Sequence, residues 1–161
     1  LGPLISDSQV ALVKAIIDDA VAKGAKLLAG GTPKGRMFPA TVLSGVKPGI
    51  RAFEEEIFGP VAVVVAYDSD EHAIQLANMS EFGLAAGIIA KDVARARRMG
   101  MRLKVGHLHI NDQTVMASPN APFGGRGKSG NGSRISGPAI WEEFTQWVWI
   151  TSRADAVRYP F

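Results

Sequence analysis

The sequence predicts an α/β fold with a mostly parallel βαβ sheet, helices on both of its faces and a C-terminal strand. Short apolar runs alternate along the chain with helical patterns of about 10 to 15 residues, which indicates βαβ units. One run, residues 61–66, is continuous and rich in valine. This composition is typical of a strand covered on both faces, and therefore of one in the middle of a sheet.

The C-terminal strand is predicted from Phe144 to Thr151, where both faces carry large apolar groups. No obvious partner strand remains in the chain beyond it. Such a strand either adds to the sheet of a neighbouring subunit or is buried within its own subunit, and the pattern alone leaves both readings open.

Length and composition describe a soluble globular domain. With 161 residues, of which 47% are apolar and 20% charged, the chain is long enough to bury a core. No apolar run approaches the roughly 20 residues that cross a bilayer. A net charge of +3 gives no strong case for nucleic acid or an anionic membrane as a partner.

The chain contains no cysteine, which excludes disulfides, thiolate metal sites and a thiol nucleophile. Its first residues carry no secretory signal, so the expected location is the cytoplasm. Because Leu1 is not an initiator methionine, we expect the chain to begin within a longer protein.

The N-terminal third is predicted to form one helix and two strands. Ser6-Asp7-Ser8-Gln9 is a capping box, in which Ser6 satisfies a backbone amide and Gln9 reaches back, and Gly24 ends the helix. The apolar residues that share one helix face are Val10, Val13, Ile16, Ile17, Ala20 and Val21. Residues 26–29 and 38–43 are strand candidates separated by a turn rich in glycine.

Two further helices and two strands follow the valine-rich run. Asp68 is expected to cap one helix, with Glu71 at its third position, and Asp92 the next. Residues 84–90 and 105–110 are the strand candidates. On the second helix Arg95, Arg98 and Arg102 form a basic stripe, which without interleaved aromatic residues indicates a solvated face rather than a phosphate-binding surface.

An acidic turn, residues 53–60, precedes the valine-rich run. Three successive carboxylates stand here, followed by an aromatic residue and a Gly-Pro pair. Such a turn is either a solvated corner or a carboxylate directed at a polyol, and the turn alone favours the solvated corner.

Residues 111–137 form a long segment rich in glycine, which inside a compact domain usually has a function. Gly127-Lys128-Ser129 resembles the end of a phosphate-binding loop, but the motif requires a glycine where Pro122 stands. His107 and His109 share a strand face, yet no third ligand is nearby, so packed histidines are favoured over a metal pair. We therefore predict no metal site.

Several motifs together resemble the C-terminal part of the aldehyde dehydrogenase superfamily. They are Glu55-Glu56-Ile57-Phe58-Gly59-Pro60, the 105–110 strand running into Asn111, Pro122-Phe123-Gly124-Gly125 and Ser129-Gly130-Asn131-Gly132. The resemblance covers essentially the whole chain. Residues 110–115 and 144–147 look most like the branch that acts on benzaldehyde and vanillin.

The resemblance implies roles for particular residues. Glu56 would bind the hydroxyls of the nicotinamide ribose of NAD or NADP, with Phe58 packing near the same end of the cofactor. Phe123 would lie near the aldehyde tunnel, and Asn111 and Thr114 would belong to the segment that shapes substrate choice. Residues 1–137 would form part of the catalytic domain, and residues 138–161 a strand and tail that join a homo-oligomer.

The sequence departs from the family at two places. Gly132 is followed by Ser133-Arg134, so the role of the glutamate frequently found there is not transferred. The nucleophilic cysteine is absent, so no catalytic residue is assigned and the isolated chain is expected to be inactive. The expected activity of the intact enzyme is oxidation of an aromatic aldehyde to a carboxylic acid; the alternatives are a non-catalytic oligomerisation module or a nucleotide triphosphatase.

Overall fold

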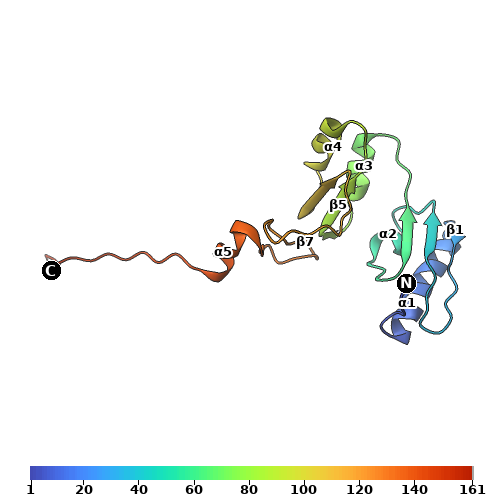
Figure 1. Cartoon of the computed structure of the whole chain (residues 1–161), viewed down its shortest axis with the longest axis horizontal. Helices are drawn as coiled ribbons and strands as arrows, with labels where there is room; N and C mark the ends of the chain where they lie inside the picture. The colour runs from blue at the N-terminus through green and yellow to red at the C-terminus, as the bar shows by residue number, and fades with distance from the viewer. Residues whose placement is uncertain (161) are drawn as a thin grey trace. The chain divides into compact units, whose positions relative to one another are not determined.

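The computed structural model describes residues 1–160 and has the predicted α/β character (Figure 1). It divides into two compact units: residues 1–81 with 92–104, and residues 82–91 with the described residues from 105 on. The first unit contains α1 (Asp7–Ala22), β1 (Lys26–Ala29), β2 (Thr41–Ser44), α2 (Arg51–Glu54), β3 (Val61–Val64), α3 (Asp70–Ala77) and α4 (Val93–Gly100). The second contains β4 (Phe82–Gly83), β5 (Ala85–Ile88), β6 (His107–Ile110), β7 (Arg126–Gly127), the 3-10 helix η1 (Gly137–Ala139) and α5 (Ile140–Phe144).

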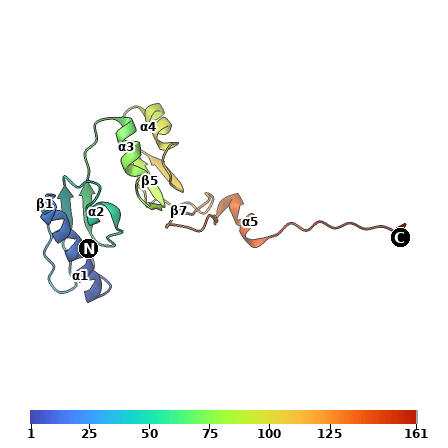
Figure 2. The same cartoon turned by 180° about the vertical axis from the view of Figure 1, so that it is seen from behind.

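The sheets are mixed rather than mostly parallel. In the first unit the order is β1-β2-β3, with β1 antiparallel to β2 and β3 parallel to it (Figure 2). In the second unit β5 and β6 are parallel, whereas β4 and β7 are antiparallel. The prediction that residues 61–66 lie in the middle of a sheet is wrong for this chain. β2 has partners on both sides, and β3 is at the edge with Val64 half-exposed.

The core of the first unit forms between α1 and the segments around β2. The predicted face of α1 is confirmed at Val13, Ile16, Ile17 and Ala20, all buried, while Val21 is largely exposed. Ser6 caps the helix as predicted, its hydroxyl accepting from the amide of Gln9 at 3.1 Å. The side chain of Gln9 does not complete the capping box, because it bonds elsewhere.

One polar side chain is buried in this core. The hydroxyl of Thr41, which is 1% exposed, accepts from the amide of Gly31 at 3.0 Å and donates to the carbonyl of Pro39 at 2.9 Å. Both of its hydrogen-bonding capacities are used, so its burial carries no unsatisfied group.

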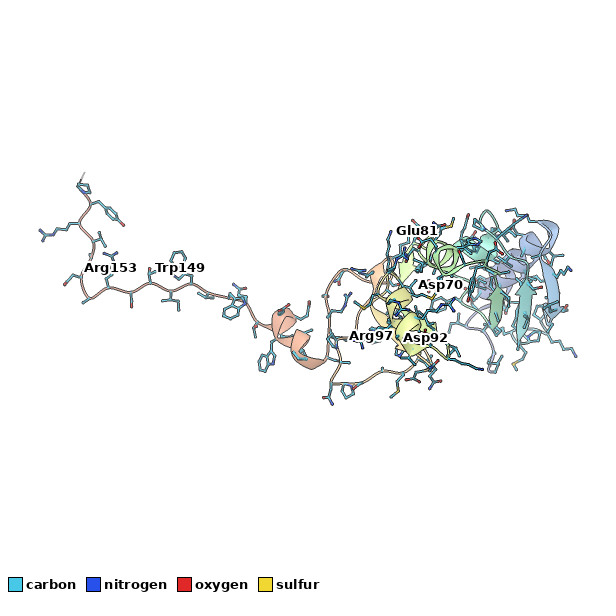
Figure 3. The ribbon with its side chains drawn as sticks, turned by 90° about the horizontal axis from the view of Figure 1, so that it is seen from above. Asp70, Glu81, Asp92, Arg97, Trp149 and Arg153 are labelled. Carbon is cyan, nitrogen blue, oxygen red and sulfur yellow. The ribbon has the colours of Figure 1, made fainter. Side chains whose placement is uncertain are left out.

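Helices α3 and α4 are joined by ion pairs. Asp92 caps α4 as predicted, whereas α3 is capped by Ser69 rather than by Asp68, since the helix starts one residue later than expected. Arg95 bonds Asp70 through two guanidinium nitrogens (Figure 3 labels Asp70 and Asp92), and Arg102 bonds Glu71 at 2.7 Å. The predicted basic stripe is thus partly neutralised by carboxylates of α3.

The predicted C-terminal strand is not formed within the described chain. Phe144 is the last residue of α5, and the residues that follow pair with no strand among residues 1–160. Trp147 is 100% exposed and Trp149 nearly so (Figure 3), so of the two readings left open by the sequence, burial within the same chain does not hold for residues 1–160. No helix in residues 1–160 has the length and apolar character to cross a membrane.

Candidate functional site

The acidic turn begins as a helix, because Phe53 and Glu54 belong to α2. Glu54 accepts from the amide of Gly49 at 2.8 Å. Glu55 bonds the guanidinium of Arg51 at 2.6 and 2.9 Å, and these hydrogen bonds hold the pKa of Glu55 below its usual value. Two of the three carboxylates are therefore occupied within the chain.

Glu56 differs from its two neighbours. Its carboxylate is exposed and makes no hydrogen bond or ion pair with residues 1–160. An ionised carboxylate offers two oxygens as acceptors, so Glu56 alone in this turn is free to accept hydrogen bonds from a ligand.

Phe58, two residues after Glu56, has an unusual backbone conformation. Its φ is 49°, in the left-handed region that costs a bulky residue about 1 to 3 kcal/mol, and its ring is 76% exposed. The side-chain amide of Gln9 donates to the carbonyls of Ile57 at 3.0 Å and of Phe58 at 3.1 Å. The turn is thus fastened to α1 in a conformation that presents an aromatic ring to the outside.

Gly59 fits against α1 because it lacks a side chain. A Cβ atom at this position would stand 2.7 Å from the Cγ2 atom of Val13, which is fully buried. Only glycine therefore allows the turn to approach the helix this closely.

Asn111 follows β6 directly and also has a positive φ, of 55°. Its side-chain oxygen accepts from the amide of Ala90 at 2.8 Å, and its side-chain nitrogen donates to the carbonyl of Ala90 at 3.0 Å. This pair of bonds clasps the ends of the parallel strands β5 and β6. The polar atoms of Asn111 are therefore engaged with backbone.

Thr114 and Phe123 lie in the segment rich in glycine, both within the second unit. Thr114 is exposed, and its methyl group faces Gly87 of β5, 3.4 Å from where a Cβ of that glycine would lie. Phe123 is 40% exposed and lines a cavity of about 280 Å³ together with His107, His109 and Met116. The cavity is mostly apolar in lining, which suits an aromatic ligand.

The two histidines of β6 are packed, as predicted. The Nε2 atom of His107 accepts from the amide of Gly124 at 3.1 Å, and its ring lies 4.6 Å from the ring of Phe123. His109 stands edge-on to His107, with 6.4 Å between ring centroids. Within residues 1–160 no group of three acidic or histidine side chains is placed to hold a metal ion.

The fragment of a phosphate-binding loop has no supporting structure. Gly127 pairs with Phe82 in a two-residue ladder, and Ser129 accepts from the amide of Gly83 at 3.1 Å. No helix begins after Ser129 until η1, so the strand, loop and helix order of such a site is missing.

Comparison with known proteins decides the family. The model of the aldehyde dehydrogenase family matches residues 1–150. The chain belongs to the aldehyde dehydrogenase family. This confirms the resemblance carried by the Glu-Glu-Ile-Phe-Gly-Pro and Pro-Phe-Gly-Gly motifs.

Individual members of the family align with the whole chain. The benzaldehyde dehydrogenase [NAD(+)] of Pseudomonas putida is 49% identical over 161 residues, and the vanillin dehydrogenase of an Amycolatopsis species is 45% identical over 162 residues. Each match covers 100% of this chain and 33% of the relative. The chain thus spans about a third of the length of these dehydrogenases, and they belong to the branch that the sequence predicted.

A solved structure agrees with the fold as well. The salicylaldehyde dehydrogenase of Pseudomonas putida G7, complexed with salicylaldehyde, superposes with a TM-score of 0.92 at 39% identity. The superposition covers 100% of this chain and 33% of that protein. The arrangement described above is therefore that of an aldehyde dehydrogenase.

Sequence reasoning overlooked two residues that hold this family's motifs in place. The sequence pattern accounts for Gln9 only as part of a capping box, whereas its bonds to the acidic turn join residues far apart in the chain. The same pattern presents His107 only as a packed histidine or a metal ligand. The motif at Phe123 and Gly124 gave no local signal that a side chain of β6 would bond it, because the contact spans 17 residues.

Proposed function

We propose that the protein containing this chain oxidises an aromatic aldehyde to its carboxylic acid with NAD or NADP. The observation that carries the proposal is Glu56, whose carboxylate has no partner among residues 1–160 and which stands two residues before the exposed ring of Phe58 in the family motif. Similarity to benzaldehyde, vanillin and salicylaldehyde dehydrogenases supports the substrate class. The benzaldehyde dehydrogenase is named as an NAD(+) enzyme, which supports NAD as the cofactor.

The chemistry of a nicotinamide ribose suits Glu56. The ribose presents two adjacent hydroxyls, and a carboxylate accepts one hydrogen bond at each oxygen. Phe58 would cover the same end of the cofactor, and an apolar ring there excludes water from the place where hydride moves. Because Gln9 and Gly59 fasten the turn before any ligand binds, little ordering remains to be done on binding.

The substrate side is assigned to the second unit. Phe123 would contact the aromatic ring of the aldehyde, and Thr114 would border the entrance from the same segment. Asn111 would act by fixing the start of this segment, since its amide is committed to Ala90.

Bond-making chemistry is assigned to residues outside this chain. An acyl intermediate requires a nucleophile such as a thiolate, and the chain has no cysteine. We therefore predict that the isolated chain forms no NADH from NAD and benzaldehyde, whereas the whole protein does.

Assembly is proposed through the C-terminal segment. The exposed side chains of Trp147, Trp149 and Ile150 need cover, and an extended segment with unpaired backbone groups is suited to join the sheet of a second copy. Removal of the residues after Phe144 from the whole protein should lower the number of subunits in its oligomer, as measured by the molar mass in solution. An unchanged number of subunits would exclude this role. A cytoplasmic location is proposed with it.

The test of the cofactor site compares two neighbouring carboxylates. In the whole protein, Glu56→Gln should weaken NAD binding or slow hydride transfer by about tenfold, because charge-assisted hydrogen bonds to the ribose are lost. Glu55→Gln is the matched control, since that carboxylate is committed to Arg51. Equal kinetics for Glu56→Gln and wild type would refute the assignment.

A further inference from the structure

We infer that His107 is a positioning residue that sets the place of Phe123 in the aldehyde pocket. The inference deepens the proposed function and rests on it. His107 lies on β6 and reaches the Pro-Phe-Gly-Gly segment with its ring, so one side chain connects a strand of the sheet to the segment that lines the cavity.

Two independent contacts support this role. The amide of Gly124 donates to Nε2 of His107 at 3.1 Å, which fixes the residue directly after Phe123. The ring of His107 also packs against the ring of Phe123, with 4.6 Å between centroids and a 51° tilt. A single side chain therefore fixes both the backbone and the ring orientation at this position.

The backbone of Phe123 is held by a second contact, to Ile135. Its amide donates to the carbonyl of Ile135 at 2.7 Å, and the amide of Ile135 donates back at 3.0 Å. This isolated bridge has no strand on either side of it. Without His107 the segment would keep one anchor of two, so its position above the cavity would be less defined.

Close contact between two backbone segments explains why the side chain of His107 can reach the amide of Gly124. A Cβ on Gly106 would overlap the carbonyl oxygen of Gly124, so the two backbone segments are in close contact where each has a glycine. This close approach brings the amide of Gly124 within hydrogen-bonding distance of the side chain of His107, the residue after Gly106.

The hydrogen bond also defines the state of the imidazole. Nε2 accepts a hydrogen bond from the amide of Gly124, so it carries no hydrogen of its own, and the neutral ring carries its hydrogen on Nδ1. Burial lowers the pKa of His107, and the neighbouring His109 and the charge of Arg134 lower it further. Burial and both neighbouring groups therefore favour the neutral form that the hydrogen bond requires.

The test uses the whole protein and three variants. His107→Phe keeps an aromatic ring and removes the acceptor, and His107→Gln returns an acceptor oxygen near the place of Nε2. His72→Phe is the control, because it makes the same exchange at a histidine of α3 that does not line the cavity. Hydrogen exchange of the peptide containing Gly124 is measured by mass spectrometry, and KM and kcat are measured with benzaldehyde and with NAD.

His107→Phe should speed exchange of that peptide about two- to tenfold, as expected for one lost hydrogen bond, and raise KM for the aldehyde severalfold with KM for NAD unchanged. His107→Gln should recover most of both effects. Unchanged exchange in His107→Phe, or faster exchange with an unchanged KM for the aldehyde, would overturn the inference. If wild type oxidises no aldehyde, the proposed function fails, and the exchange rates alone decide whether His107 holds the segment.

Discussion

Removal of the Gln9 side chain should loosen the acidic turn and weaken cofactor binding while leaving helix α1 intact. Gln9→Leu deletes the two bonds to the carbonyls of Ile57 and Phe58. The cap of α1 survives, because it uses the backbone amide of residue 9 and the hydroxyl of Ser6. The substitution therefore separates the turn from the helix that supports it.

The magnitude follows from two opposing terms. Each of the two hydrogen bonds contributes about 0.5 to 1.5 kcal/mol net, so together they contribute about 1 to 3 kcal/mol. The left-handed conformation of Phe58 costs about 1 to 3 kcal/mol. Since the hydrogen bonds and the conformational cost are of similar size, loss of the bonds should allow Phe58 to leave the left-handed conformation in a large fraction of molecules. A shift of about 1 to 2 kcal/mol corresponds to roughly a 5- to 30-fold higher Kd for NAD.

The assay is titration of the whole protein with NAD, followed by fluorescence or calorimetry, for wild type, Gln9→Leu and Gln75→Leu. Gln75 is an exposed glutamine of α3, so its variant controls for exchanging a surface amide for leucine on a helix. If Gln9→Leu binds NAD within twofold of wild type, the turn does not depend on Gln9, and the reasoning from strain and hydrogen bonds is refuted.

Three further predictions concern stability and pH. Thr41→Val should lower the free energy of unfolding by about 2 kcal/mol, since it leaves the buried amide of Gly31 and the carbonyl of Pro39 without their hydroxyl partner, and an unchanged midpoint of urea unfolding would contradict this. Gly59→Ala should cost about 1 to 3 kcal/mol by overlap with Val13, and adding Val13→Ala should cost less than the sum of the two single changes, as a double-mutant cycle would measure. Because the pKa of His107 is depressed in the folded protein, its stabilising effect is complete above about pH 6.5 and is lost as pH falls through the folded value; protection of the Gly124 amide, taken relative to the intrinsic exchange rate at each pH, should therefore fall on acidification in wild type and not in His107→Phe.

Local signals in the sequence predicted most of the elements. The caps at Ser6 and Asp92 were found because a short polar side chain stood directly before an apolar period. Strand order could not be found this way. The valine-rich run indicated burial on both faces, but the same composition fits an edge strand, and only pairing shows that β2 has the central place.

The candidate site divides in the same way. Glu56, Phe58 and Phe123 stand in motifs that can be recognised from neighbouring letters. Gln9 contacts the turn across 48 residues, and no local pattern encodes such a contact. The C-terminal strand could not be placed for another reason, since a strand needs a partner and apolar residues on both faces do not say which chain supplies it.

Backbone strain separates two ways of building a site. Among residues 1–160 three non-glycine residues have a positive φ, namely Phe58, Asn111 and Ser136, and the first two are candidate ligand-facing positions. Asn111 stabilises its own conformation, because its side-chain amide forms hydrogen bonds with both the backbone amide and the carbonyl of Ala90. Phe58 has no polar side-chain atom and depends on Gln9 to hold its carbonyl. Phe58, whose ring is free to contact a ligand, is thus stabilised by a residue of α1. Asn111 stabilises itself, and its side-chain polar atoms are already used in doing so. This difference makes Gln9 and Phe58, rather than Asn111, the pair at which a substitution should alter ligand binding most directly.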